Sequence, residues 1–386
     1  MKAFNYERQS NKMNIGLIGF GSMGKTHAYA IHNMKYFYSS LSYDAKITAV
    51  CAAHYENAMT ATERYSLGEA RHSEDDIIGD PTIDIIDICT PNIYHYETLK
   101  KAIAAGKHIY CEKPLCVTAA QAEEIAGLAE KAGIKGQIVF NNRFMTPPMR
   151  AKQMIESGQL GRILSFRCDY LHSSCMDVNK NAGWKQNRDI CGGGVLFDLG
   201  SHALDMAVWL CGRIKSVSGR GQIAFPARRG IDGNEWNTNA DEAFYMICET
   251  ESEAVGTVSA SKIAIGTNDD LSFEIYGERG ALKYSLMEPE WLWYYDGARA
   301  GGELGGIGGF TKIECGGRYP TPGGAFPSPK APVGWLRGHV ESYHSFLTAV
   351  AEDKTTNPSF KDASHIQLVM ERAYESNQNG GGMLTC

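Results

Sequence analysis

The strongest constraint on the fold of this chain is a glycine-rich turn near its start. The turn consists of Gly19-Phe20-Gly21-Ser22-Met23-Gly24. It follows the apolar run Ile15–Ile18 and precedes a helical pattern at Lys25–Tyr36. A strand, a Gly-x-Gly-x-x-Gly turn and a helix in this order form the first unit of a doubly wound parallel sheet. Gly19 would make the tight turn, Gly21 would let a pyrophosphate approach the backbone, and Gly24 would let the helix pack against the strand.

The rest of the first half continues this pattern of short apolar runs separated by helical stretches. The predicted strands are Ile15–Ile18, Ile47–Cys51, Ile83–Cys89, His108–Cys111 and Gln137–Phe140. The predicted helices include Lys25–Tyr36, Tyr94–Ala105 and Ala119–Ala132. Continuous apolar strands between helices indicate a parallel sheet covered on both faces. We therefore predict a Rossmann domain over residues 13–141, preceded by a polar N-terminal arm, residues 1–12.

The second half, residues 142–386, alternates between apolar and polar residues without intervening helices over much of its length. The predicted strands are Ile214–Phe225, Phe244–Thr250, Ala254–Ile263, Leu271–Tyr276 and Leu282–Ser285. The predicted helices are Ser201–Leu210, Trp335–Ala351 and Asp362–Tyr374. This order predicts an α+β domain with a large, mostly antiparallel open sheet, so that the whole chain is of the α/β class. The Gly- and Pro-rich segment 296–332 is predicted to lack regular structure and to be a lid, a subunit contact or disordered.

Composition limits the classes of partner. The chain has 386 residues, a formal net charge of −6 and no cluster of Lys and Arg, so neither nucleic acid nor an anionic membrane surface is expected as a partner. No run approaches the roughly 20 apolar residues of a membrane span, and residues 1–12 lack a signal-peptide core. The eleven cysteines show no paired Cys-x-x-Cys spacing. We therefore expect reduced thiols, no metal site and a cytoplasmic protein.

The end of the second predicted strand bears on the choice of cofactor. Cys51-Ala52-Ala53-His54 contains no carboxylate to bind the adenosine ribose, and the first acid is Glu56. The segment also contains no Arg or Lys that would hold a 2′-phosphate. NAD(H) is favoured because the cation is missing, NADP(H) stays open, and His54 is a candidate hydrogen-bond partner of the ribose.

Two further segments follow predicted parallel strands and complete the predicted cofactor site. They are Thr90-Pro91-Asn92, with His95 close behind, and Glu112-Lys113-Pro114. Ligands of open α/β sheets bind at the carboxyl ends of the strands, so Lys113 would project toward the reactive end of a dinucleotide. Taken alone, a lysine at the position of Lys113 is more often an exposed lysine after a strand, and His95 could pack on its helix.

In its motifs the chain resembles the Gfo/Idh/MocA family of glucose–fructose oxidoreductase and inositol dehydrogenase relatives. The matching segments are Gly19–Gly24 with His27, Thr90–Asn92 with His95, Gly106–Pro114 and Gly192–Asp205. The resemblance implies that Lys113, Asp198 and His202 surround the reacting carbon. His202, whose ordinary pKa of about 6.5 suits proton transfer, would accept the hydroxyl proton. Lys113 would polarise the oxygen and Asp198 would anchor the substrate, unless Asp198 is a helix cap and His202 a core histidine.

The resemblance also supplies the expected substrate contacts and function. The expected substrate-binding residues are Arg143, Tyr170, His172, Trp184 and Lys185, with Asp198 and His202. Aromatic faces beside hydrogen-bonding groups suit a sugar ring. We predict an NAD(P)-dependent oxidoreductase acting on a secondary alcohol or ketone of a sugar, cyclitol or glycoside, with glycoside 3-oxidation as one form, and a homodimer or tetramer formed through the second sheet. A redox-neutral glycoside-cleaving enzyme with tightly bound NAD and a non-enzymatic dinucleotide sensor stay open.

Overall fold

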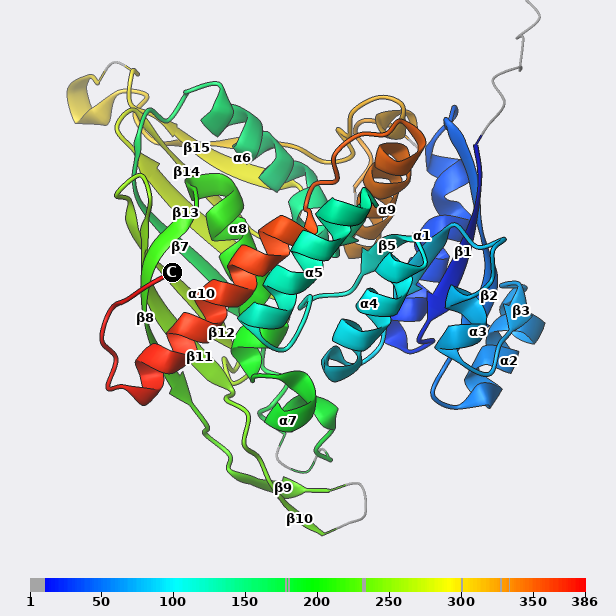
Figure 1. The fold of residues 1–386 in the computed structure, drawn as a ribbon. Helices are drawn as coiled ribbons and strands as arrows, with labels where there is room; N and C mark the ends of the chain where they lie inside the picture. The colour runs from blue at the N-terminus through cyan, green and yellow to red at the C-terminus, as the bar shows by residue number, and fades with distance from the viewer. Residues whose placement is uncertain are drawn as a thin grey trace, which may run out of the picture.

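The computed structural model describes residues 11–177, 179, 181–230, 234–299, 301–326, 328–332 and 334–386. Their strands form a six-stranded sheet, a nine-stranded sheet and a small two-stranded ribbon. Figure 1 shows the two large sheets on opposite sides of the molecule, with several helices between them. Residues 1–10 of the predicted arm lie outside the described residues, whereas residues 11–12 belong to the first strand.

The six-stranded sheet is parallel throughout and has the order β3-β2-β1-β4-β5-β6. Its strands are β1 (Asn11–Ile18), β2 (Tyr43–Cys51), β3 (Glu69–Ala70), β4 (Ile85–Ile88), β5 (His108–Cys111) and β6 (Gly136–Ile138). Every residue of β4 is buried, as expected of a central strand covered on both faces. From β1 the chain first adds β2 and β3 on one side and then adds β4 to β6 on the other. This reversal of strand order between β1 and β4 creates the crevice where such sheets bind ligands. The predicted Rossmann sheet is confirmed.

The helices of this sheet begin and end at recognisable signals. They are α1 (Ser22–Phe37), α2 (Tyr55–Tyr65), α3 (Glu74–Ile78), α4 (His95–Ala104) and α5 (Ala119–Ala132). Thr118 caps α5 by accepting a hydrogen bond from the backbone of Gln121, and Gly133 ends the helix in the left-handed conformation. α1 begins within the glycine-rich turn, earlier than predicted, because the last residues of that turn are already helical.

The nine-stranded sheet has the order β16-β15-β14-β13-β7-β12-β11-β8-β17 and is antiparallel except between β7 and β12. Its strands are β7 (Ile163–Leu171), β8 (Ile214–Gln222), β11 (Ala243–Thr250), β12 (Val255–Ser261), β13 (Asp270–Gly277), β14 (Gly280–Ser285), β15 (Trp291–Asp296), β16 (Phe310–Glu314) and β17 (Leu384–Thr385). The ribbon pairs β9 (Ala227–Arg229) with β10 (Glu235–Asn237). The predicted mostly antiparallel sheet is confirmed.

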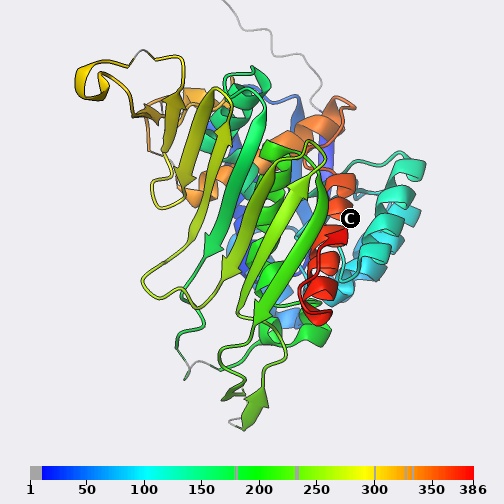
Figure 2. The same cartoon turned by 90° about the vertical axis from the view of Figure 1, so that its left-hand side faces the viewer.

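Three helices cover the inner face of this sheet and leave the outer face bare. They are α6 (Thr146–Glu156), α8 (Ser201–Cys211) and α10 (Phe360–Gln378). Figure 2 shows the opposite face of the strands with no helix in front of it. Among the described residues, one helical stretch, Arg188–Cys211, is long and apolar enough to cross a membrane by length and composition, and 83% of its apolar window is buried inside the protein.

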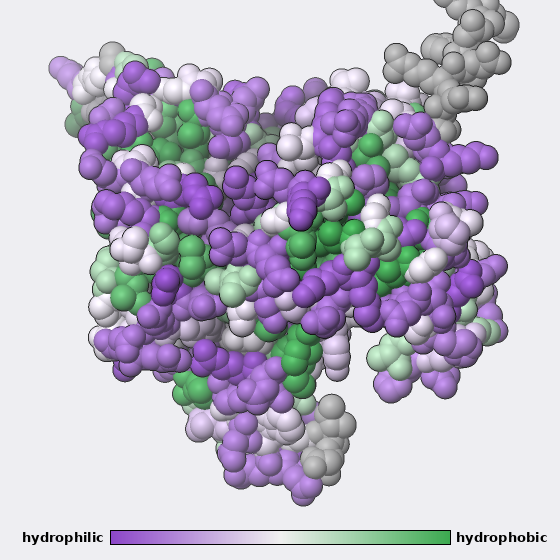
Figure 3. Space-filling model, in the orientation of Figure 1, coloured by the Kyte–Doolittle hydropathy of each residue, from purple (hydrophilic) through white to green (hydrophobic). Residues whose placement is uncertain are grey.

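One helix near the C-terminal end of the chain returns to the Rossmann domain. Helix α9 (Trp335–Ala351) packs against α1, and its residues Val340, Tyr343, Phe346 and Leu347 share a hydrophobic core with β1 and α1. The prediction that segment 296–332 lacks regular structure is wrong in part, because β16 pairs with β15 and forms one edge of the sheet. Polar side chains cover most of the face shown in Figure 3, and apolar residues form small patches between them.

Candidate active site

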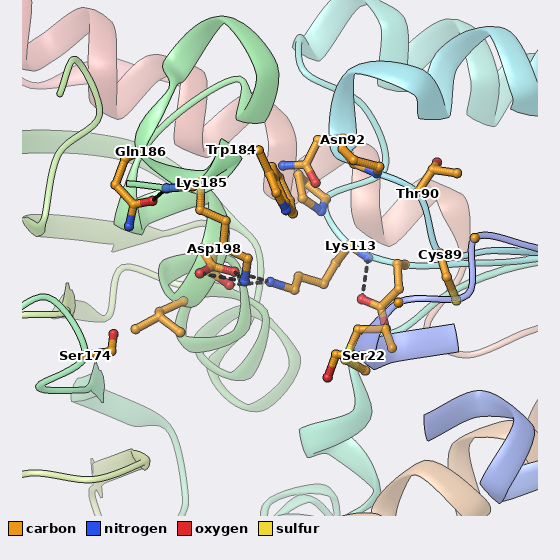
Figure 4. Close-up of a pocket in the computed structure, with 18 of the residues that line it drawn as sticks. Ser22, Cys89, Thr90, Asn92, Lys113, Ser174, Trp184, Lys185, Gln186 and Asp198 are labelled. Carbon is orange, nitrogen blue, oxygen red and sulfur yellow. Dashed lines mark hydrogen bonds and ion pairs between the residues drawn. The ribbon is translucent and has the colours of Figure 1, made fainter. Parts of the chain in front are cut away.

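A cleft of about 770 Å³ lies between the carboxyl ends of the Rossmann strands and the inner side of the second sheet. Most of the predicted site residues line it. They are Gly19, Phe20, Gly21, Ser22, Met23, Thr90, Pro91, Asn92, Glu112, Lys113, Tyr170, His172, Trp184, Lys185, Asp198 and His202. The cleft therefore brings together segments that are far apart in the sequence. Figure 4 shows Lys113 and Asp198 pointing toward each other across it.

The glycine-rich turn has the geometry of a phosphate cradle. Gly19 has a φ of +98°, and a Cβ there would lie 2.6 Å from the carbonyl oxygen of Cys89. A Cβ on Gly24 would lie 2.2 Å from the carbonyl oxygen of Gly19, so α1 could not approach the turn this closely with any other residue. A Cβ on Gly21 would contact nothing within 4 Å and would project into free space at the start of α1. The residues present therefore fit a dinucleotide pyrophosphate at this helix N-terminus.

Near β2 the cleft is lined by small, uncharged side chains. Ala52, Ala53 and Asn57 line it. His54 lies exposed at the start of α2 and is not among the lining residues, so the structure does not bring it to the position predicted for a ribose contact.

Three lysines surround one carboxylate at the other end of the cleft. Lys113 Nζ donates to Asp198 Oδ1 at 3.1 Å and also to the Asp198 carbonyl oxygen. Lys185 Nζ lies 2.8 Å from Oδ1, and Lys262 Nζ lies 2.9 Å from Oδ2. Burial alone would raise the pKa of Asp198, but the three ammonium groups, Lys262 foremost, hold it well below its usual value. The carboxylate is thus occupied by lysines and does not cap a helix.

His202 lies at the start of α8, directly after the π-helical turn Leu196–Gly200 that carries Asp198. The edges of the Tyr170 and Phe140 rings pack against its imidazole, with centroid distances of 5.8 and 5.9 Å. Burial and the nearby Lys113 ammonium lower the pKa of His202 to about 3, so the imidazole is neutral at ordinary pH. Its Nδ1 has no hydrogen-bond partner within the described chain.

Lys262 is the main site residue that the sequence analysis missed. It follows β12 at the end of a run of small and apolar residues, is only 8% exposed in its side chain and pairs with Asp198. A lysine at a position where the strand pattern demands burial was the available signal. The other lining residues not singled out include Asn141, Ser174, Cys175, Asn181, Gln186, Leu199, Arg228 and Trp335.

The structure does not place Arg143 in the cleft, where it was predicted to contact substrate. Its guanidinium is buried behind the cleft, where Nε donates to both carboxylate oxygens of Asp205 at 2.9 and 3.1 Å. Nη1 donates to Asn357 Oδ1 at 2.7 Å. Arg143 therefore joins the start of the second half to α8 and to the chain before α10. Asn141, two residues earlier, lines the cleft in its place.

Two regions of the chain match domains of known proteins. Residues 13–140 match the NAD-binding Rossmann fold of an oxidoreductase family, and residues 149–283 match the GFO/IDH/MocA C-terminal domain. The chain belongs to the Gfo/Idh/MocA oxidoreductase family.

Two relatives that match nearly the whole length of this Gfo/Idh/MocA oxidoreductase are sugar dehydrogenases. Levoglucosan dehydrogenase of Pseudarthrobacter phenanthrenivorans is 30% identical over 377 residues, covering 94% of this chain and 96% of the relative. Glucose-6-phosphate 3-dehydrogenase of Bacillus subtilis is 23% identical over 373 residues, covering 96% and 97%. A solved structure of levoglucosan dehydrogenase with NADH and levoglucosan superimposes with a TM-score of 0.92 at 30% identity, covering 97% of this chain and 99% of that one. The chain is thus an NAD-dependent enzyme of this family.

His95 lies outside the cleft of this Gfo/Idh/MocA oxidoreductase, although the sequence analysis predicted it in the cofactor site. It is fully buried, and its ring nitrogens lie 2.9 Å from the carbonyl oxygens of Pro114 and Thr90. It therefore ties the loop after β4 to the loop after β5. Asn92, from the first of these loops, donates to the Cys191 carbonyl at 2.8 Å and joins the two halves across the cleft.

Proposed function

We propose that this Gfo/Idh/MocA oxidoreductase oxidises a secondary ring hydroxyl of a pyranoside with NAD+, at the carbon corresponding to C3. The observation that carries the proposal is the meeting of Lys113, Asp198 and His202 in one cleft with the glycine-rich turn. The named activities of its relatives support the substrate class, since they include levoglucosan dehydrogenase and glucose-6-phosphate 3-dehydrogenase. D-glucoside 3-dehydrogenase of Escherichia coli is 29% identical over 216 residues, 54% of this chain and 57% of the relative.

In the proposed reaction the cleft residues hold the hydroxyl and take its proton. The glycine-rich turn and the loops after β4 and β5 would hold NAD+, which supplies the hydride acceptor when bound. Lys113 Nζ, held on one side by Asp198, donates its remaining hydrogen to the substrate oxygen and stabilises the charge that develops there. His202 is neutral before the reaction and accepts the hydroxyl proton as the carbon–hydrogen bond breaks.

The remaining cleft surface suits a sugar ring. Tyr170, Trp184 and Trp335 present aromatic faces and edges that can cover the apolar C–H face of a pyranose. Lys185 and Lys262 retain hydrogens that can be donated to hydroxyl groups beside the reacting one. The side chain of Lys185 is 45% exposed and lies toward the mouth of the cleft, where it can meet the part of the substrate nearest solvent.

The direct test has two steps. Purified protein is denatured and the released nucleotide is identified by mass spectrometry, and then absorbance at 340 nm is followed with NAD+ and a panel of levoglucosan, methyl glucoside, glucose 6-phosphate and xylose. The expected result is NADH formation with a 3-keto product identified by NMR, abolished in Lys113→Met. Glycoside cleavage without net NADH would favour the redox-neutral reaction. NAD+ binding without any sugar chemistry would favour the sensor and overturn the proposal.

We also propose that the protein is a cytoplasmic homo-oligomer assembled through the bare face of the second sheet. That face carries Tyr245, Ile247 and Val255, which are 50–52% exposed and belong to the paired strands β11 and β12. Exposed apolar side chains clustered on an uncovered sheet are typical of a subunit interface. All eleven cysteines are unpaired, which supports a reducing compartment.

A further inference from the structure

A buried histidine behind the cleft bridges two carboxylates, one of which belongs to the motif that carries Lys113. His27 Nδ1 lies 2.9 Å from Asp87 Oδ1, and its Nε2 lies 3.1 Å from Glu112 Oε1. The three side chains come from α1, β4 and β5 and are 0%, 0% and 7% exposed. The sequence analysis gave His27 no role beyond its place in the glycine-rich motif. We propose instead that His27 is a positioning residue, held as an imidazolium between Asp87 and Glu112, that fixes Glu112 and through it Lys113.

The geometry requires protons on both ring nitrogens. A carboxylate oxygen accepts hydrogen bonds, so a neutral imidazole would turn one unprotonated nitrogen toward a negative oxygen. Burial alone would lower the pKa of His27, yet the Asp87 carboxylate raises it well above the ordinary value. Burial alone would raise the pKa of Glu112, and its bond to His27 brings it to about 2. His27 is therefore an imidazolium and Glu112 a carboxylate at ordinary pH.

The other groups described around His27 do not supply the positive charge between Asp87 and Glu112. The Cys89 thiol lies 3.2 Å from His27 Nδ1, and burial keeps it protonated by raising its pKa. Burial lowers the pKa of His339 to about 3, so that ring is neutral. Tyr343 donates to Asp87 Oδ2 at 3.0 Å, and the Tyr110 ring packs on the imidazole at 5.1 Å. The nearest positive partner for both carboxylates is thus His27 itself.

Glu112 links His27 to Lys113 in the cleft. Its Oε2 accepts a hydrogen bond from the backbone N–H of Lys113 at 3.2 Å, and Glu112 itself lines the cleft. Figure 4 shows this bond at the base of the Lys113 side chain, which extends from there to Asp198. With one oxygen on His27 and the other on Lys113, the carboxylate cannot rotate without breaking a buried charged bond. The backbone of Lys113, from which its side chain extends, is therefore held in place by Glu112 and His27, whereas no atom of His27 needs to touch substrate.

The first measurement uses the native enzyme and does not depend on knowing the sugar. In ¹⁵N NMR of histidine-labelled protein, the His27 signals, assigned with His27→Gln, should show two protonated nitrogens from pH 6 to 9. The ¹³Cε signal of Lys113 is assigned with Lys113→Met. Its titration curve should differ from that of the wild type in His27→Gln and match that of the wild type in His339→Gln. His339 is the matched control because it is equally buried on the neighbouring helix and its ring nitrogens have no hydrogen-bond partner within the described residues.

The kinetic measurement rests on the proposed function. His27→Gln should lower kcat about 10- to 100-fold, as expected for a residue that orients a catalytic group, and leave the Kd of NAD+ nearly unchanged. His339→Gln should leave kcat near that of the wild type.

Two results would overturn the inference. One is a neutral His27 tautomer in the native enzyme at pH 8; where His27→Gln fails to fold, the His27 signals are assigned through their backbone connectivity instead. The other is an unchanged Lys113 titration in a folded His27→Gln variant. Failure of every sugar to yield NADH would instead overturn the proposed function, and the two NMR measurements would still decide the role of His27.

Discussion

Lys262 Nζ lies 2.9 Å from Asp198 Oδ2, whereas Lys113 Nζ contacts Oδ1 and Lys185 Nζ contacts both oxygens. This pairing holds Asp198 from the inner side of the second sheet while Lys113 reaches it from the Rossmann domain. The aspartate thus keeps its carboxylate charged and fixed before any substrate arrives. The position of Lys113 relative to the sugar therefore depends on a lysine that never needs to contact the cofactor.

Lys262→Met should lower kcat about tenfold or more, because Asp198 loses its most buried cation and can turn away from Lys113. Lys185→Met is the matched comparison, since it removes another ammonium group from the same carboxylate. Its side chain is 45% exposed, so the effect on kcat should be within about threefold, as for exposed ion pairs. Steady-state kinetics at saturating NAD+ provide the measurement, and equal effects of the two substitutions would contradict the assigned difference.

The pH dependence of kcat should show no inflection near 6.5. The neutral form of His202 is the one that accepts a proton, and it is lost only as the pH falls through its lowered pKa of about 3. An ordinary histidine would cost about tenfold in rate for each pH unit below 6.5. The profile between pH 5 and 8 should therefore lack an acid limb from this residue. An acid limb near 6.5 that disappears in His202→Asn would show that His202 titrates normally.

Gly21→Ala and Gly24→Ala should separate cofactor binding from folding. The added methyl group at Gly21 meets no protein atom within 4 Å, so the variant should keep the wild-type Tm and lose affinity for NAD+. At Gly24 the methyl group would lie 2.2 Å from the Gly19 carbonyl oxygen, so that variant should lower the Tm as well. Differential scanning calorimetry and NAD+ titration measure the two effects. Undiminished NAD+ affinity in Gly21→Ala would place the pyrophosphate elsewhere.

Arg143→Met should reduce stability before it reduces substrate affinity. The substitution strands the buried Asp205 carboxylate, and breaking such a pair costs about 3–5 kcal/mol in free energy of unfolding. Burial already raises the pKa of Asp205 to about 6 even with Arg143 in place. The double substitution Arg143→Met with Asp205→Leu should recover part of the stability. Urea unfolding measures both, and a raised KM at wild-type stability would return Arg143 to the substrate site.

Ile247→Asp should convert the proposed oligomer to a smaller species. The isoleucine is 50% exposed on the bare face of β11, where a carboxylate is compatible with solvent but not with an apolar subunit interface. Ile265→Asp offers a control, because that isoleucine is 78% exposed and lies outside the strands. Light scattering coupled to size exclusion gives the masses. A monomeric wild-type protein would contradict the proposed assembly.

The Rossmann half was predictable because local signals and long-range structure agree there. Strand β5 and helix α5 begin and end at the predicted residues, and the glycine-rich turn occupies the expected place between β1 and α1. The second half was predictable as a sheet, but β16 was missed because its Phe310–Glu314 segment sits in a Gly- and Pro-rich setting and is stabilised only by pairing with β15. Edge pairing is a tertiary effect that composition does not reveal.

The site residues were likewise predictable where a local motif places them and were missed where a tertiary contact places them. The motif that follows β5 and carries Lys113 lies where the topology of the sheet requires. Lys262 was missed because it reaches Asp198 only through the fold of the second sheet. Arg143 was misplaced because its sequence position is adjacent to the cleft while its guanidinium points away, toward a partner 62 residues later. The direction of a long side chain is set by such a partner, which no local pattern identifies.

Helix α9 has a consequence for how the chain folds during synthesis. Its side chains Val340, Tyr343, Phe346 and Leu347 fill part of the hydrophobic core that β1 and α1 begin. A ribosome releases the N-terminal strands first. One side of the hydrophobic core that they form stays uncovered until helix α9, which ends at residue 351, has emerged. The nucleotide-binding half is therefore first in the order of translation and among the last parts to be completed, so that a prematurely ended chain exposes an apolar surface that chaperones and proteases can recognise.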